Sequence, residues 1–140
     1  MAVNVVGFDN VRVLKAAVEQ SPSGANSLFL ISGVAVINFH GPASGYNRDS
    51  LVFLVPNEGH TNPHDPALDI GHYIDSTVVA FPTAVEATTQ QAVGWAVDSV
   101  NTVAGGPQGH NVQLTAHLAA LNPGSTIIRI GFQVNVLSRA

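Results

Sequence analysis

Histidine and carboxylate side chains gather in one segment of the chain, Asn57–His72. Imidazole and carboxylate groups are ordinary ligands of zinc and other divalent ions. The segment contains no HExxH pair, and two of its candidates stand between prolines, where side chains are hard to direct toward one point. A divalent metal site is therefore one interpretation, and a solvated polar loop with local hydrogen bonds is the other. The residues that would bind the metal are His60, His64, Asp65 and His72.

Trp95 is the only tryptophan and suggests a different kind of chemistry. An exposed indole ring can stack on the apolar face of a sugar while neighbouring polar groups supply directional hydrogen bonds, whereas a buried ring would anchor the core. In an extended strand Trp95 and Asp98 point to opposite faces. Both reach one sugar only if the strand bulges near Val97 or another subunit contributes Asp98. The candidate ligand-binding residues are Trp95, Asp98, Asn101 and His110.

No pattern of residues indicates catalysis. The sequence has no GxSxG motif, no phosphate-binding loop with its lysine, and no cysteine. His40, His110 and His117 have serines and aspartates elsewhere in the chain, but no spacing joins them into a catalytic triad. We therefore expect a protein that is not an enzyme and that carries no cofactor, apart from the divalent metal considered above.

The chain is poor in charge. Charged residues make up 10% of the sequence, against about 25% in average globular proteins. Such a surface lacks the self-repulsion that keeps monomers apart, and it offers amide and hydroxyl groups to neutral ligands such as sugars. The formal charge of −4, with five scattered basic residues, argues against nucleic acid as a partner. We therefore expect a homo-oligomer, a trimer or larger, with glycans as candidate ligands.

Hydropathy and chain length limit where the protein can be located and how many domains it can contain. No run approaches the roughly 20 apolar residues of a membrane helix, and the N-terminus lacks the basic region of a secretory signal. We therefore expect no membrane partner and synthesis as a soluble cytoplasmic protein, later released or associated with a particle. The length of 140 residues fits a single domain over 1–140.

Alternation of apolar and polar residues predicts β-strands throughout the chain. Asn111–Leu121 and Ser125–Leu137 show it most clearly, and the Asn-Pro-Gly break between them predicts that the two pair as a hairpin. The nearly continuous apolar run Leu28–His40 is typical of a central strand buried on both faces. Further strands are expected at 3–8, 10–20, 50–56, 73–81 and 93–97.

Some segments leave alternatives open. Residues 10–20 also fit a helix, although the hairpin-like loop after them favours a strand. Residues 83–92 fit one helical turn or an edge strand, and 100–109 are expected to form a loop. Together the segments predict an all-β protein, an antiparallel β-sandwich or jelly roll of seven to eight strands with little helix.

The order of three segments resembles the H-type lectin domain. In that family a strand ending in a Phe-Pro-like pair precedes a strand with an aspartate, and two long alternating strands follow. The matching segments are 77–85, 92–100 and 111–132. The resemblance covers 77–137 and implies a trimeric or hexameric sandwich that binds a hexose or N-acetylhexosamine at subunit seams, through Asp98 and neighbouring polar residues. The chain departs from the family in having no disulfide and no tryptophan near Val134.

Two classes of function follow from these features. The first is a non-catalytic, homo-oligomeric glycan-binding module. The second is a self-assembling structural protein of a virus or phage particle, such as a capsid decoration, coat or tail component. An enzyme of cupin-like type, with the loop histidines on a metal, comes third. In each case the loop Asn57–His72 is expected to be adaptable and to contact a neighbouring subunit or a ligand.

Overall fold

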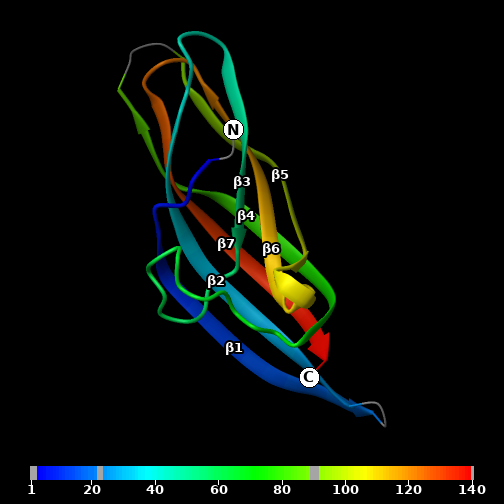
Figure 1. Cartoon of the computed structure of the whole chain (residues 1–140). Helices are drawn as coiled ribbons and strands as arrows, with labels where there is room; N and C mark the ends of the chain where they lie inside the picture. The colour runs from blue at the N-terminus through cyan, green and yellow to red at the C-terminus, as the bar shows by residue number, and fades with distance from the viewer. Residues whose placement is uncertain (1–2, 22–23, 89–91, 140) are drawn as a thin grey trace.

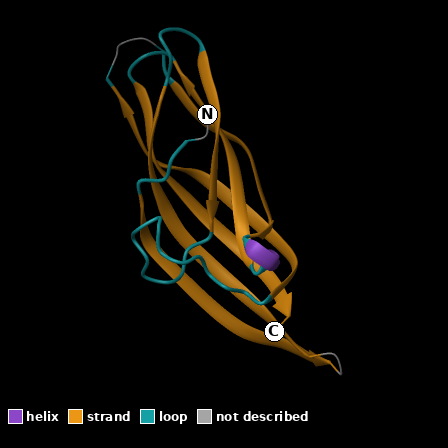
Figure 2. Ribbon diagram, viewed as in Figure 1, coloured by secondary structure: helices purple, strands orange, loops and turns teal. Residues whose placement is uncertain are grey.

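The computed structural model describes residues 3–21, 24–88 and 92–139. Within these residues, seven strands form two antiparallel sheets that pack face to face (Figures 1 and 2). The all-β sandwich expected from the alternation is confirmed. One sheet has the order β1-β2-β7-β4 and the other has the order β3-β6-β5. The elements are β1 (Gly7–Ser21), β2 (Gly24–His40), β3 (Tyr46–Leu54), β4 (His72–Ala87), β5 (Gly94–Gly105), the 3-10 turn η1 (Pro107–Gly109), β6 (Asn111–Leu121) and β7 (Ser125–Arg139).

The core lies between the two sheets and is filled by the alternate, inward-facing residues of their strands. Three phenylalanines meet there, Phe8 of β1, Phe53 of β3 and Phe132 of β7, with ring centroids 5.3, 6.4 and 5.2 Å apart. Gly33 of β2 leaves room for this cluster, because a Cβ at that position would lie 2.8 Å from the Phe132 ring. The aromatic cluster therefore ties the two sheets together.

β6 and β7 do not pair with each other, so the predicted hairpin is wrong. β6 lies between β3 and β5, whereas β7 lies between β2 and β4 in the other sheet. The connection crosses from one sheet to the other with left-handed backbone at Asn122 (φ 67°) and Gly124 (φ 84°). Two strands on opposite sides of one core show the same alternation as a hairpin does, so the pattern does not distinguish the two arrangements.

Several element boundaries differ from those expected. β4 continues through Pro82 to Ala87, because on an edge strand a proline can turn its nitrogen away from the neighbouring strand. This makes 83–87 an edge strand, while 89–91 lie outside the described residues. β5 extends to Gly105, through most of the stretch expected to be a loop. β1 covers the segment for which a strand was favoured over a helix, but it begins only at Gly7.

The outer face of β2 is only partly buried, which corrects the expectation of burial on both faces. Its alternate residues from Phe29 to Phe39 face the core. The apolar residues between them face outward, and no other described segment buries them. These outward-facing residues are Leu28, Leu30, Val34 and Val36.

The two long edges of the sandwich are built differently. Where β4 meets β5, the hydroxyl groups of Ser76 and Thr102 share a hydrogen bond of 2.5 Å. Between β1 and β3 the N-terminal segment and the long β3–β4 loop bridge the sheets instead, and Phe8 N–H donates to the Thr61 carbonyl at 2.9 Å. The described residues contain no helix long and apolar enough to cross a membrane.

Candidate functional site

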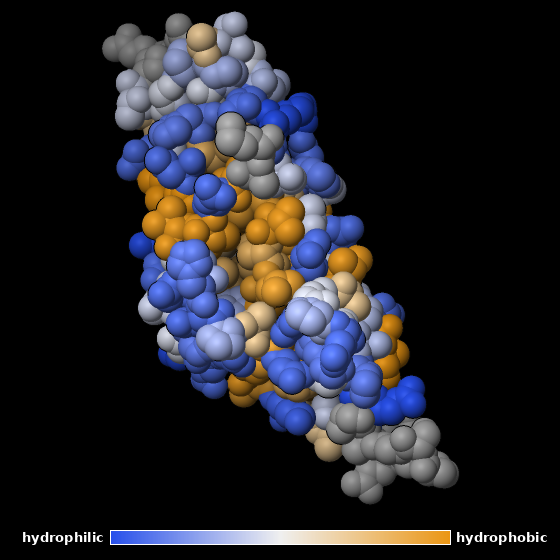
Figure 3. All heavy atoms as spheres, in the orientation of Figure 1, coloured by the Kyte–Doolittle hydropathy of each residue, from blue (hydrophilic) through white to orange (hydrophobic). Residues whose placement is uncertain are grey.

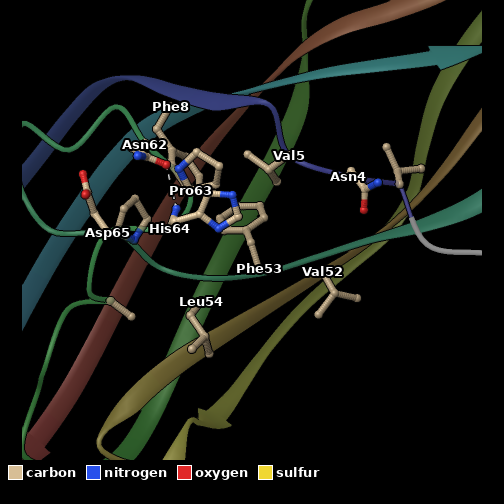
Figure 4. A pocket seen from close by; sticks show the side chains of 13 residues that line it. Asn4, Val5, Phe8, Val52, Phe53, Leu54, Asn62, Pro63, His64 and Asp65 are labelled. Atoms are coloured by element: carbon tan, nitrogen blue, oxygen red, sulfur yellow. Dashed lines mark hydrogen bonds between the residues drawn. The ribbon is translucent and has the colours of Figure 1, made fainter.

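A groove with a volume of about 630 Å³ opens at the β1–β3 edge of the sandwich. Phe8 and Phe53 form its floor, and both rings are buried. Its walls are the N-terminal segment, the end of β3 and a turn of the β3–β4 loop (Figure 4). Figure 3 shows apolar residues gathered in the middle of the molecule, framed by polar ones. The lining residues are Val3, Asn4, Val5, Phe8, Val52, Phe53, Leu54, Pro56, Asn62, Pro63, His64, Asp65 and Ala67.

The loop wall is held in place by its own polar residues. The side-chain amide of Asn57 donates to the Pro66 carbonyl at 3.1 Å and so closes the turn. Inside that turn, Asn62 Oδ1 accepts a hydrogen bond of 2.9 Å from the His64 backbone N–H, and the Asn62 carbonyl accepts one of 3.1 Å from the Asp65 N–H. These bonds hold His64 and Asp65 at the rim of the groove.

The opposite wall is the free edge of β3. The Ser50 carbonyl faces outward, because it accepts a hydrogen bond of 2.8 Å from the Val3 N–H. Backbone groups alternate in direction along an antiparallel strand, so those of Val52 and Leu54 also face outward. Both residues line the groove. The parallel bridge between Val3 and Leu51 engages the Val52 N–H with the Val3 carbonyl, whereas the Val52 carbonyl and both backbone groups of Leu54 have no backbone partner on that side within the described residues. This part of β3 can therefore accept a further strand.

The charge in the groove is negative. Asp65 is the carboxylate among its lining residues, and none of the residues that line it is lysine or arginine. A neighbouring hollow on the other side of the N-terminal segment contains Asp49 and is likewise lined without lysine or arginine. A ligand that enters the groove therefore meets acidic and neutral polar groups beside an apolar floor.

The candidate metal ligands do not converge. His64 and Asp65 lie at the groove, whereas His72 starts β4 and its ring packs edge-on against His110, with centroids 5.1 Å apart. His60 has a buried Nδ1 without a hydrogen-bond partner among the described residues. In the described chain, no group of three or more histidine, cysteine or carboxylate residues is placed to hold a metal ion. The geometry thus adds no support to the metal site considered from the sequence.

Trp95 and Asp98 lie on opposite faces of β5. Trp95 packs against the core, and its indole nitrogen is buried without a hydrogen-bond partner in the described part of the chain. Asp98 is the extra residue of a β-bulge between Val97 and Ser99. Its carboxylate forms an ion pair with Arg48 across the outer surface of the three-stranded sheet. The bulge occurs where a shared sugar site required one, but it leaves the two side chains apart.

The other two candidate ligand-binding residues are also separated from each other. Asn101 lies in the middle of β5, opposite Thr115 of β6. His110 lies just before β6, against the ring of His72. The four candidates therefore share no common surface, and the placement of Trp95 favours its structural role.

Sequence reasoning missed the outward-facing surface of the four-stranded sheet, here called the outer face. Its large apolar residues are strongly exposed: Leu14 of β1 is 67% exposed, and Val79 of β4 is 52% exposed. Phe81 of β4 is also half-exposed, and its ring lies over Gly131 of β7, where a Cβ would come within 3.1 Å of it. The apolar run of β2 was the signal in the sequence, because it supplies apolar residues to both faces of this sheet.

Comparison with known proteins returned no relative. No family model, no curated protein and no solved structure matches the chain. The resemblance to H-type lectins therefore stays a prediction.

Proposed function

We propose that this chain is a non-catalytic structural protein that self-associates through the outer face. The supporting observation is the outer side of β2, which is apolar but remains partly exposed in the single chain. Strands that are apolar on both faces are typical of sheets covered on both sides. The outer face of a second copy supplies the cover that one chain lacks.

The outer face is large enough for a stable contact. Its strands contain 15 to 17 residues. With about 3.3 Å per residue and about 4.8 Å between strands, the sheet measures roughly 50 by 19 Å, or about 900 Å². A standard protein interface buries about 800 Å² on each partner. Two such faces can therefore pack on one another as the two sheets of a sandwich do.

The polar groups of the outer face are compatible with pairing of two copies. Asp9 and Arg129 neutralise each other through an ion pair of 2.7 Å. Arg12 of β1 adds an exposed positive charge beside Leu14, and a contact between two copies must leave this charge at its rim. The middle of the face carries the side chains of Gln133 and Asn135. Amide groups both donate and accept hydrogen bonds, so they can bond to the same groups of another copy across a two-fold axis.

The structural role has stronger support than glycan binding at the residues indicated by the sequence. That hypothesis relied on Trp95 as an exposed platform, and its ring instead packs against the core. Coat, decoration and tail proteins of particles assemble from many copies of one chain. An outer face that pairs with itself is consistent with a building block of that kind.

Light scattering tests the proposal, because one chain has a mass of 14.5 kDa. The wild-type protein is expected to be a dimer or larger. Val79→Asp places a charge on the outer face and is expected to produce a monomer, since burying an unpaired carboxylate is costly. Val103→Asp is the matched control, because Val103 is 47% exposed on edge strand β5 but belongs to the other sheet.

The proposal is supported if the Val79→Asp variant loses assembly and the Val103→Asp variant keeps it. A wild-type protein that is monomeric at micromolar concentration contradicts it, and so does a Val79 variant that assembles like the wild type. Circular dichroism of both variants shows that each keeps its β-structure, so that unfolding is not mistaken for dissociation.

A further inference from the structure

We propose that the groove binds an extended peptide, which adds as a strand to the free edge of β3. This inference goes beyond the proposed function, because the groove lies at the β1–β3 edge and not on the outer face. It rests on three features of the groove, which are its backbone groups, its apolar lining and its charge.

The backbone groups of β3 provide the main recognition. The Val52 carbonyl and the N–H and carbonyl of Leu54 face the groove, while the Val52 N–H already pairs with Val3. Val52 and Leu54 are spaced about 6.8 Å apart, which is the two-residue repeat of an extended chain. The protein already uses this edge once, since Val3 N–H bonds to the Ser50 carbonyl and pairs in parallel with Leu51. A bound peptide would continue the same edge beyond the point where the N-terminal segment leaves it.

The apolar lining favours a peptide over a sugar. Sugars bind against exposed aromatic rings, but the rings of Phe8 and Phe53 pack on each other and on Phe132 within the core. The walls above this aromatic floor carry aliphatic groups, which belong to Val5, Leu54 and the prolines of the loop. Every second side chain of an added strand would face this lining, as in other cases of strand addition.

The charge of the groove favours a basic residue in the peptide. Asp65 stands at the rim without a lysine or arginine among the residues that line the groove. No described salt bridge involves Asp65. A lysine in the peptide can reach the carboxylate, whereas an acidic residue would be repelled by it. The expected ligand is therefore an extended peptide with alternating apolar residues and one basic residue.

Fluorescence anisotropy with synthetic peptides tests this inference. The probe is fluorescein-labelled, amide-capped VTVKVT, and it is expected to bind with a Kd below about 1 mM. Two further probes carry N-methyl groups on alternate residues, one on the odd and one on the even positions. In an added strand only one of these two sets of N–H groups bonds to β3. Methylation of that set should therefore weaken binding at least about tenfold, whereas methylation of the other set should change binding little.

Two protein variants test the role of the charge. Asp65→Asn is expected to weaken binding of the lysine peptide about threefold, as for an ion pair at the surface. Glu58→Gln is the matched control, because Glu58 is an exposed acid of the same loop that does not line the groove. It should leave binding unchanged. Replacing the lysine of the probe with glutamate should weaken binding to the wild-type protein.

Equal binding of the two methylated probes would overturn strand addition, and so would absence of binding by the parent peptide at about 1 mM. Binding of labelled N-acetylglucosamine oligomers in place of the peptide would make the groove a glycan site and also overturn it. The Val79→Asp variant should bind the peptide as the wild type does. Light scattering therefore reports loss of self-association, and anisotropy reports loss of peptide binding, independently of each other.

Discussion

Gly41, between β2 and β3, is the position where one added methyl group is expected to destabilise the fold most clearly. A Cβ there would collide with the backbone oxygen of Asn122 and with the Ser125 hydroxyl. The Gly41 N–H also donates to the Ser125 carbonyl at 2.8 Å, which prevents the chain from moving away. We expect Gly41→Ala to lower the free energy of unfolding by about 3 kcal/mol, measured by urea denaturation.

Gly94→Ala is the control for this prediction. A Cβ at Gly94 would lie 3.7 Å from the Cβ of Leu121, which is ordinary contact. The substitution should change the free energy of unfolding by less than about 1 kcal/mol in either direction. Equal losses in the two variants would show that the collision at Gly41 is not the cause.

Trp95→Phe tests the structural role of the indole. The smaller ring loses contacts with the core but also removes a buried N–H donor that has no hydrogen-bond partner in the described structure. The two effects oppose each other, so we expect a net loss of about 1 kcal/mol in stability and no change in oligomeric state. If the melting temperature were unchanged and sugar binding were selectively lost, Trp95 would instead be a ligand-binding residue.

At the scale of elements, the sequence predicted strands better than their partners. Alternation identified the strands ending at Leu121 and beginning at Ser125, and it identified their buried faces. It did not show that the turn between them crosses the core, because pairing depends on the order of strands in each sheet. The orientation of Trp95 was readable, since it shares a strand face with Val93 and Val97 while Ala96 lies on the other.

The candidate site was predictable in part for the same reason. Length and composition identified the loop as the part to examine, and His64 and Asp65 do line the groove. The second wall of the groove is the edge of β3, beside which the described residues place no strand beyond the single bridge at Val3. The sequence of a strand does not indicate whether its edge is covered, so the groove could not be predicted without the order of the strands in each sheet.

Substitutions of Asn122 test how the turn between β6 and β7 is stabilised. Its side chain accepts a hydrogen bond of 3.1 Å from the Gly45 N–H and donates one of 2.6 Å to the Ala92 carbonyl. Its backbone has a φ of 67°, which glycine adopts without strain. Asn122→Gly should therefore lose about 1 kcal/mol of stability for the hydrogen bonds, whereas Asn122→Ala should lose about 2 kcal/mol because it adds backbone strain.

Thermal denaturation of the two variants measures this difference. Equal melting temperatures for the glycine and alanine variants would mean that the left-handed backbone contributes nothing to the cost. A variant as stable as the wild type would mean that the exposed hydrogen bonds of Asn122 are replaced by water without loss.

At the scale of the whole molecule, the two proposed surfaces differ in physical character. The outer face is broad and apolar with amides in its middle, whereas the groove is narrow, acidic and lined on one side by free backbone groups. Burial of apolar area depends little on ionic strength, whereas attraction between exposed charges is screened by salt. Solution conditions therefore separate the two kinds of contact.

Self-association through the outer face should respond to concentration and not to simple salt. Unfolding separates the copies, so the melting temperature should rise when the protein concentration is increased a hundredfold. Raising NaCl from roughly 50 to 500 mM should leave the light-scattering mass unchanged, since screening acts on charges, and sulfate should strengthen the assembly. The Val79→Asp variant should lose the concentration dependence. An assembly that NaCl dissociates would be ionic and would contradict an apolar contact through the outer face.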